Sequence, residues 1–380
     1  MMENNQLPLL LACIPAFLYV MIIMRFTFGW VSLNGVKQNR PSQPATSFSV
    51  IIAARNEAAS ITKCLYALLQ QDYPIKLFEV IVLDDHSTDN TFQIITDFIA
   101  AHQDFPLRIL RAEDHGKKSA IKQAIKYASG QLIVTTDADC KVSPQWLNAY
   151  ADCYEQTRSR CISGPVRMEG SGLFAHLQEL EFMSLIASGA GSIGAGMPVM
   201  CNGANFCYEK QAFKDVNGFQ GNERFVSGDD IFLMHKISKR FGTFAITFLK
   251  DRRAIVVTSV QPDLKSFFRQ RMRWTSKSPG YRDAGIILTA ITVFLTHIGL
   301  VLGLGYGLIS GLWQPFFLIF VSKLLIDFPL LVISAHFMQQ KKLLFYFLPV
   351  QFLLPFYVLI TTVGGLFSNV SWKGRAHNSI

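Results

Sequence analysis

The chain has 380 residues, of which 50% are hydrophobic and 17% are charged. This composition is too apolar for an ordinary soluble protein, so we expect membrane-spanning segments. The net charge of +9 does not indicate a nucleic-acid partner, because the basic residues concentrate beside hydrophobic runs, where anionic lipid headgroups are the matching partner. The seven cysteines show no C-x-x-C spacing, which suits a reducing compartment and predicts no zinc site.

The first expected span is residues 7–24, a charge-free run of about the minimum length for a membrane-crossing helix. The only charged residue before this run is Glu3, and basic residues follow it at Arg25, Lys37 and Arg40. The positive-inside rule therefore places the central region in the cytoplasm, at the inner membrane. A secretory signal peptide is the competing interpretation, but no basic segment precedes the run and no small-x-small cleavage site follows it.

Beyond this anchor and a Pro-containing linker, strand patterns alternate with helical patterns. Strands are expected at 49–54, 78–83, 107–110 and 131–136, and helices at 57–70, 88–101 and 117–128. This order predicts an α/β fold with a parallel sheet, whose ligands bind beyond the carboxyl ends of the strands.

Polar motifs follow three of these strands: Arg55-Asn56-Glu57, Asp84-Asp85 and Asp137-x-Asp139. One acidic turn is commonly a helix cap or a solvated loop, but three turns at the same edge of a sheet predict a single site. Two carboxylates one residue apart can share a hard divalent cation, Mg²⁺ or Mn²⁺, that neutralises charge on a leaving diphosphate.

The remaining acceptors at this edge suit a nucleotide. Asp84 and Asp85, with Asn56 and Glu57 nearby, can accept from a base imide and from ribose hydroxyls. No G-x-G-x-x-G follows the first strand, which argues against a dinucleotide site. The sequence also has no G-x-x-x-x-G-K-[ST] phosphate loop. Lys117 precedes a helix and either reaches a phosphate or belongs to a solvated helix start.

A second group of motifs lies further along the chain. Asp229 and Asp230 open the helical stretch 231–240, so they either cap that helix or supply a general base. Residues 262–274 alternate apolar and basic side chains, as an interfacial helix does. This helix ends in the Q-x-x-R-W spacing of Gln270, Arg273 and Trp274, in which an arginine suits a diphosphate and a tryptophan stacks on a sugar.

Three more spans are expected at 284–312, 315–337 and 343–367, and the last of these has a re-entrant segment as its alternative. Lys323 and Asp327 stand inside the second of these spans and would share one helical face. They predict either a contact with an acceptor or subunit, or a pair that satisfies itself.

In this order the motifs resemble those of the membrane-bound glycosyltransferases of family 2, whose catalytic domain has the GT-A fold, an α/β fold with a Rossmann-like, mostly parallel sheet. The resemblance covers residues 47 to about 280. It rests on the segments 49–57, 82–89, 116–120, 137–139, 228–230 and 270–274. One departure is Asp229, because the family has Glu-Asp where this chain has Asp-Asp.

The resemblance implies an inverting transferase with Mg²⁺ or Mn²⁺ and a UDP-sugar donor, favoured over a GDP-sugar. It implies Asp137 and Asp139 as metal ligands, and Asp230 as the catalytic base with Asp229 beside it. The implied donor-binding residues are Ala54, Arg55, Asn56, Glu57, Asp84, Asp85, Lys117, Asp137, Gln270, Arg273 and Trp274. The implied acceptor-binding residues are Asn202, Gly203, Ala204 and Trp274, in the small-residue region 189–206.

The predicted domains are an anchor (1–31), a linker (32–47), a GT-A domain (48–261), an interfacial segment (262–283), three membrane helices (284–370) and a tail (371–380). We expect sugar transfer to a lipid-linked or growing glycan acceptor in cell-envelope or exopolysaccharide synthesis. The alternatives are a processive polysaccharide synthase that needs a partner subunit or oligomer for export, a non-catalytic glycan-binding subunit, and a nucleotidyl- or phosphoryl-transferase.

Overall fold

The computed structural model describes residues 6–38, 45–223, 225, 227–367, 371–372 and 375–376. The chain divides into two compact units, which are described separately. Unit 1 comprises residues 1–32, 171–199 and 261–368, and unit 2 comprises residues 33–170, 200–260 and 369–380. Residues 171–199 lie within the range predicted for the catalytic domain but belong to unit 1.

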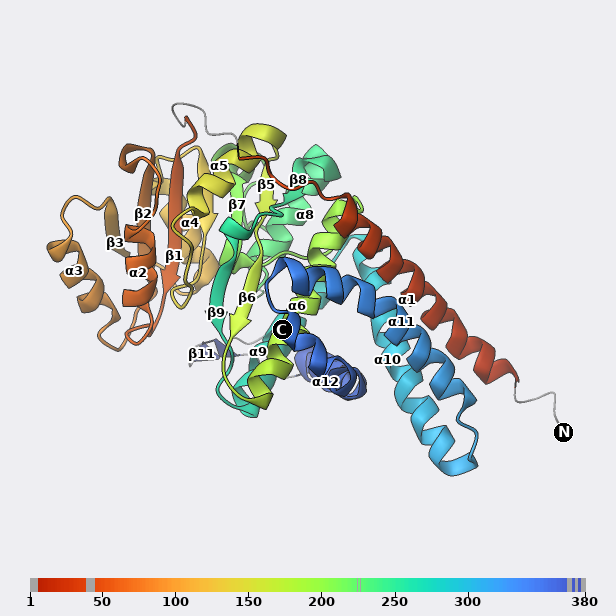
Figure 1. Cartoon of the computed structure of the whole chain (residues 1–380). Helices are drawn as coiled ribbons and strands as arrows, with labels where there is room; N and C mark the ends of the chain where they lie inside the picture. The colour runs from red at the N-terminus through yellow and green to blue at the C-terminus, as the bar shows by residue number, and fades with distance from the viewer. Residues whose placement is uncertain are drawn as a thin grey trace. The chain divides into compact units, whose positions relative to one another are not determined.

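Unit 2 is built on a sheet of strand order β3-β2-β1-β4-β7-β5-β8 (Figure 1). The strands are β1 (Phe48–Ala54), β2 (Phe78–Asp84), β3 (Leu107–Arg111), β4 (Leu132–Thr135), β5 (Cys161–Ser163), β7 (Phe206–Glu209) and β8 (Ile246–Phe248). The first four are parallel, as the alternating pattern predicted. Every residue of β1 is buried, as expected for a central strand with both faces covered.

The antiparallel part of this sheet was not predicted. Strand β7 runs antiparallel to both β4 and β5, while β5 and β8 are parallel to each other. These strands have only three or four residues each, too few for periodicity to reveal. A separate pair, β6 (Val166–Glu169) and β9 (Val256–Ser259), is also parallel, and β10 (Ser371–Trp372) pairs with β11 (Arg375–Ala376).

The helices of unit 2 complete its core. They are α2 (Ile61–Leu69), α3 (Thr91–Ala101), α4 (Lys117–Tyr127), α5 (Trp146–Thr157), α7 (Lys210–Asp215) and α8 (Asp229–Phe241). Helix α4 packs on β1 and β2, and α3 packs on β3, each through the apolar face that its sequence predicts. The expected helices are therefore present, with starts shifted by up to four residues.

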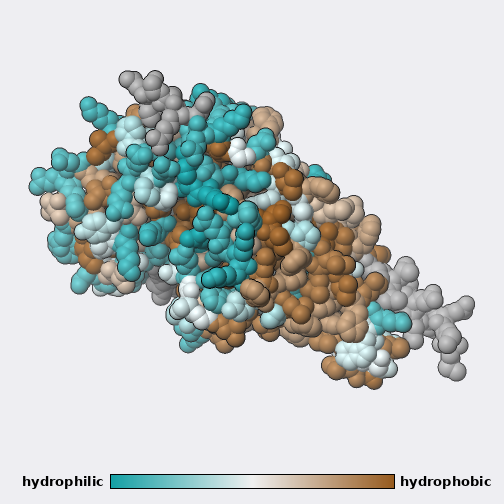
Figure 2. Space-filling model, in the orientation of Figure 1, coloured by the Kyte–Doolittle hydropathy of each residue, from teal (hydrophilic) through white to brown (hydrophobic). Residues whose placement is uncertain are grey.

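Unit 1 is helical. Its helices are α1 (Gln6–Ser32), α6 (Leu173–Gly194), α9 (Leu264–Thr275), α10 (Ala284–Ser310), α11 (Gln314–Phe337) and α12 (Phe347–Phe367). In the described part of the chain, four segments are long and apolar enough to cross a membrane: 14–32, 284–310, 314–337 and 341–367. Figure 2 shows apolar side chains gathered on the surface of these helices, as contact with lipid tails requires.

Close packing of α1 on α6 explains small residues in the 189–206 region. A Cβ atom at Gly191 would lie 2.3 Å from the carbonyl oxygen of Phe26, and one at Gly29 would lie 2.1 Å from the oxygen of Gly191. Small residues admit such backbone contact between helices. At Gly191 the close approach is therefore made by α1, and no glycan or lipid is needed to account for it.

A polar cluster joins three of these apolar helices. Lys323 and Asp327 are 2% and 9% exposed, and the Lys323 ammonium donates to Asp327 Oδ2 and to Gln351 Oε1, both at 2.5 Å. Tyr19 of α1 donates to Asp327 Oδ1 at 2.8 Å. Of the two alternatives for this pair, the self-satisfied one describes the structure, because its partners come from α1, α11 and α12 themselves.

We expect Lys323→Met to lower the free energy of unfolding by about 3–5 kcal/mol, because it leaves the buried Asp327 carboxylate without its counter-charge. Adding Asp327→Leu should restore part of the loss, since both charges are then gone. Thermal unfolding in detergent measures both effects, with Ser322→Ala at a partly exposed position of α11 as the control. A single variant as stable as the wild type would contradict the prediction.

Candidate active site

The loops after β1 and β2 are held together by direct hydrogen bonds. Arg55 Nη1 donates to the carbonyl oxygens of Asp85 (2.7 Å) and His86 (2.9 Å). Asn56 Oδ1 accepts from the backbone N–H of Thr88 at 2.8 Å. The side chains of Arg55 and Asn56, which the sequence predicted to bind donor, thus have bonds that shape the loops themselves.

Asp84 is the last residue of β2 and Asp85 follows it, but their side chains have different environments. In the sheet register Asp84 lies beside Ala54 of β1 and Arg111 of β3, so these strands end at one level. Asp84 is 4% exposed, and its Oδ1 has no hydrogen-bond partner among the described residues. A buried acceptor without a partner costs about 1–3 kcal/mol, so Asp84 has capacity for a donor from a ligand. Asp85 accepts from the backbone N–H of Gly116 at 3.1 Å.

Asp137 and Asp139 follow β4 and offer oxygen ligands at the surface. Oxygen and sulfur atoms of Asp137, Asp139 and Cys140 lie within 4.8 Å of one another. Asp139 is exposed, and its Oδ2 accepts from Thr258 at 3.4 Å. Burial, followed by the nearby carboxylates, raises the pKa of the Cys140 thiol. Two exposed carboxylates suit a hard divalent cation that keeps open positions for water or phosphate oxygens.

Lys117, the first residue of α4, connects two of the acidic motifs. Its ammonium lies 2.7 Å from Asp137 Oδ1 and 3.6 Å from Asp229 Oδ2. Burial alone would lower the pKa of Lys117, but the carboxylates of Asp137, Asp229 and Asp230 outweigh it and hold this pKa above its ordinary value. Of the two alternatives for Lys117, the solvated helix start does not describe the structure, because its side chain is only 19% exposed.

Asp230 lies beside the loop predicted to bind acceptor. Its Oδ2 accepts from the backbone N–H of Gly203 at 2.8 Å, and a Cβ on Gly203 would lie 3.4–3.5 Å from the two carboxylates of α8. Asn202 Oδ1 accepts from the N–H of Ala204 at 2.9 Å, which shapes this turn. Thr135, the last residue of β4, donates to the carbonyl of Gly203 at 2.8 Å, so the turn is attached to the sheet.

The structure therefore brings several of the predicted unit 2 residues into a connected group. Asp137 is linked through Lys117 to Asp229, and Asp230 follows directly and holds the turn at Gly203. The group combines an exposed carboxylate pair, a permanent cation and a carboxylate at a helix start. This set can hold a metal ion and a phosphate and accept a proton.

Gln270, Arg273 and Trp274 belong to unit 1 and lie on α9, where each is partly buried. The arginine between them, Arg271, was not predicted as a functional residue. It is 1% exposed, lies 2.5 Å from Glu181 Oε2 and donates to Gln270 Oε1. Its guanidinium also lies 4.2 Å from the centroid of the Trp274 ring, within cation–π range. Arg271 thus contacts two members of the Q-x-x-R-W motif.

The partners of Arg271 come from two other helices. Glu181 lies on α6 and accepts from the hydroxyl of Tyr357, on α12, at 2.8 Å. The sequence contains a signal for the role of Glu181, because an acidic residue in the mostly apolar helix α6 is expected to pair with a cation when it is buried. The alternation of apolar and basic residues in this segment instead predicts that Arg271 belongs to the basic face of an interfacial helix. The structure shows that it is a buried connection between α9, α6 and α12.

The sequence of residues 49–215 matches the family model described as glycosyl transferase family 2. This segment is a family 2 glycosyltransferase domain. The family 2 domain contains the turns after β1, β2 and β4, together with Lys117 and the Gly203 turn. Asp230 and α9 lie beyond the matched residues.

Curated relatives are similar over a larger part of the chain. The poly-β-1,6-N-acetyl-D-glucosamine synthase of Staphylococcus epidermidis is 27% identical over 237 residues, 61% of this chain and 54% of that protein. An N-acetylglucosaminyltransferase of Rhizobium meliloti is 26% identical over 257 residues, 65% of this chain and 58% of that protein. The chain thus spans a little over half the length of these relatives.

A solved structure supports the fold. The mannosyltransferase PcManGT from Pyrobaculum calidifontis, in complex with GDP-Man and Mn²⁺, superposes with a TM-score of 0.60 at 17% identity. The superposition covers 94% of this chain and 98% of that one. The family 2 domain has the GT-A fold, as the sequence motifs predicted.

We expect Arg271→Met to destabilise the protein by about 3–5 kcal/mol, because the Glu181 carboxylate would stay buried without its counter-charge. The matched control is Arg269→Met on the exposed side of the same helix, which should change the unfolding temperature little. Thermal unfolding of the detergent-solubilised protein measures both. Equal losses in the two variants would show that the Arg271–Glu181 pair has no special role.

Proposed function

We propose that this protein is a membrane-embedded inverting glycosyltransferase. It transfers a sugar from a nucleotide-diphosphate-sugar to a lipid-linked or growing glycan acceptor in cell-envelope or exopolysaccharide synthesis. The observation that carries the proposal is the connected group of Asp137, Lys117, Asp229 and Asp230 within and beside a family 2 domain. The names of the curated relatives, which are sugar transferases and polymer synthases, agree with it.

The donor would bind at the carboxyl ends of β1, β2 and β4. Asp139 and Asp137 would hold Mg²⁺ or Mn²⁺, and the bound ion would supply positive charge beside the departing diphosphate. Lys117 is charged throughout the ordinary pH range and would bind a diphosphate oxygen. Asp84, with its unpartnered Oδ1, would accept from the nucleotide, with Ala54, Arg55, Asn56, Glu57 and Asp85 forming the surrounding loops.

Asp230 would act as the general base. Its carboxylate would take the proton of an acceptor hydroxyl as that oxygen bonds to the anomeric carbon, while the bond from this carbon to the diphosphate breaks. Attack from the face opposite the leaving group inverts the anomeric configuration. The hydrogen bond from the Gly203 N–H to Asp230 Oδ2 orients the carboxylate. The acceptor side of the site would be lined by Asn202, Gly203 and Ala204, and Asp229 would lie next to the base.

Unit 1 would supply the membrane-level part of the reaction. Gln270, Arg273 and Trp274 would close over the donor, and Trp274 would also contact the acceptor. Helices long and apolar enough to cross a membrane precede and follow the family 2 domain in the sequence, which suits an acceptor that is itself lipid-linked. The basic residues that follow the first span would keep the catalytic unit on the cytoplasmic side of the inner membrane.

The nucleotide of the donor and the identity of the metal ion can be determined by experiment. A UDP-sugar is our expectation, and the structural relative solved with GDP-Man makes a GDP-sugar the alternative. A panel of both classes of nucleotide sugar, supplied with Mg²⁺ or Mn²⁺ to membranes that contain the protein, identifies donor and metal. Release of nucleoside diphosphate, and not pyrophosphate, distinguishes sugar transfer from nucleotidyl transfer.

We expect Asp230→Asn to lower the transfer rate by about 10²–10⁴-fold, because the amide cannot accept the proton. Asp139→Ala should instead weaken metal-dependent activity, and raising the Mn²⁺ concentration should recover part of it. Asp97→Asn, on the exposed face of α3, is the matched control and should keep the wild-type rate. Wild-type rates in both Asp230→Asn and Asp139→Ala would favour a non-catalytic glycan-binding subunit.

The relative named as a polymer synthase makes processive synthesis a specific second candidate. We expect labelled donor to give products extended by one sugar, because the four segments of the described residues that could cross a membrane are few for an export channel. Gel or chromatographic analysis of product length measures this directly. A ladder of long products from the purified protein would replace single transfer by processive synthesis, with a partner subunit or oligomer required for export.

A further inference from the structure

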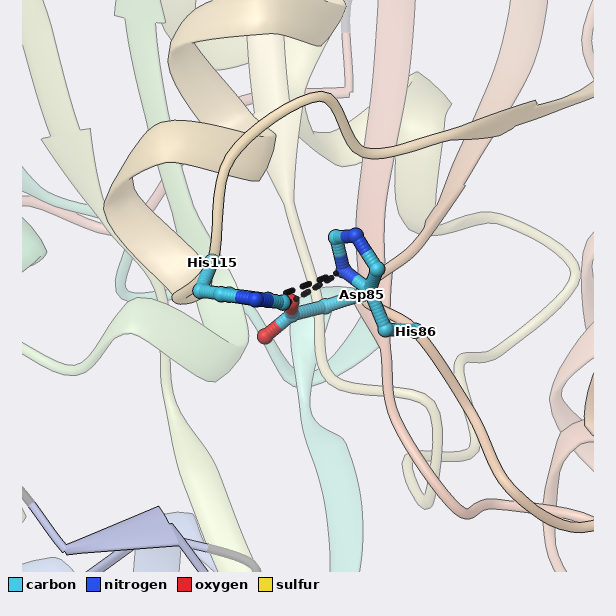
Figure 3. A group of neighbouring side chains, drawn as sticks. All are labelled: Asp85, His86 and His115. Carbon is cyan, nitrogen blue, oxygen red and sulfur yellow. Dashed lines mark hydrogen bonds and ion pairs between the residues drawn. The ribbon is translucent and has the colours of Figure 1, made fainter.

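Two histidines face the buried carboxylate of Asp85 at the end of β2. His86 follows Asp85 directly, and His115 lies just before α4 (Figure 3). His86 Nδ1 lies 3.2 Å from Asp85 Oδ1, His115 Nδ1 lies 3.2 Å from His86 Nδ1, and His115 Nδ1 lies 3.9 Å from Asp85 Oδ1. Asp85 Oδ1 and the Nδ1 atoms of His86 and His115 therefore lie close enough together to bind one metal ion.

Hydrogen bonding between neutral rings does not satisfy this arrangement. If His86 Nδ1 carries a proton and donates it to Asp85, the same nitrogen has no lone pair to accept from His115. If His115 donates to His86 instead, the lone pair of His86 is already used, and the Asp85 carboxylate receives no hydrogen from it. His86 Nδ1 can donate or accept but cannot do both, so one of the two contacts always lacks either a hydrogen atom or an acceptor.

We propose that Asp85, His86 and His115 bind a transition-metal ion, with Zn²⁺ as the best match. Zn–N and Zn–O bonds of about 2.0–2.2 Å at tetrahedral angles separate neighbouring ligand atoms by about 3.3–3.5 Å. The observed separations of 3.2, 3.2 and 3.9 Å are close to this range. Each atom then presents a lone pair to the cation, which removes the conflict between the two hydrogen bonds.

The surroundings support a prepared site. The Asp85 side chain is 0% exposed, and the N–H of Gly116 holds its Oδ2 at 3.1 Å, which directs Oδ1 to the histidines. His86 adopts a left-handed φ of 55°, a conformation that costs a non-glycine residue about 1–3 kcal/mol. Arg55 stabilises this conformation by donating to the carbonyl of His86 at 2.9 Å. Asp85 is thus fixed and His86 is held facing it.

This site differs in chemistry from the carboxylate pair at Asp137 and Asp139. Two imidazoles and one carboxylate favour Zn²⁺ and the neighbouring transition metals, whereas carboxylates alone favour Mg²⁺ or Mn²⁺. The ion would connect the end of β2 to the segment that leads into Lys117. The side chains of His86 and His115 are 39% and 61% exposed, which leaves a coordination position open to water or to a ligand.

Metal binding by the full-length, detergent-solubilised protein tests the proposal without any transfer assay. After chelator treatment, the protein is titrated with Zn²⁺ in excess Mg²⁺, and with Co²⁺ for its visible absorption. We expect one tight Zn²⁺ per chain and a Co²⁺ spectrum of low coordination number. His86→Asn, which keeps a residue that tolerates positive φ, and His115→Ala should each weaken binding by at least about 100-fold.

Two controls separate this site from other sources of binding. His102→Ala removes a histidine of unit 2 that lies outside the cluster and should leave Zn²⁺ binding unchanged. Asp139→Ala should also keep the tight Zn²⁺, and so separates this site from the metal site of the proposed transferase. Wild-type protein that binds no Zn²⁺, or binds it equally well in the His86→Asn and His115→Ala variants, would overturn the proposal.

Discussion

The Lys117 ammonium is the interaction on which the candidate site depends. It lies between carboxylates from two separate parts of the chain, Asp137 after β4 and Asp229 at the start of α8. Without a cation these carboxylates would repel each other at short range in a partly dry environment. The Lys117 ammonium allows the turn after β4 and the start of α8 to contribute carboxylates to one site. It also supplies a positive charge that can bind a diphosphate.

The same principle, a buried cation that neutralises acids from distant segments, recurs in unit 1. Arg271 forms an ion pair with Glu181 and also contacts Gln270 and Trp274. Lys323 donates hydrogen bonds to both Asp327 and Gln351. Such pairs contribute little net stability when compared with apolar packing, but breaking one partner is costly, so they hold their helices in one arrangement. We interpret the first pair as positioning the Q-x-x-R-W helix and the second as fixing α1, α11 and α12 against one another.

The metal chemistry divides in a similar way between neighbouring turns. The exposed pair Asp137 and Asp139 has oxygen ligands that suit an ion in contact with phosphate, whereas Asp85 is buried and surrounded by nitrogen. The cysteine spacing predicts no zinc site, whereas the zinc site proposed here takes its ligands from two histidines and an aspartate. Neighbouring positions in sequence, Asp84 and Asp85, therefore have separate roles in our interpretation.

The sequence by itself predicted apolar segments long enough to cross a membrane, the four parallel strands and the acidic turns that follow them, because hydrophobic periodicity and the alternation of strands with helices are local properties. Only the tertiary structure decided which charges meet. Lys117 joins Asp137 to Asp229, Arg271 pairs with Glu181 across 90 positions, and His115 reaches His86 across 29. No local pattern encodes such pairings, because they follow from loop paths and helix packing that bring residues together after the chain has folded.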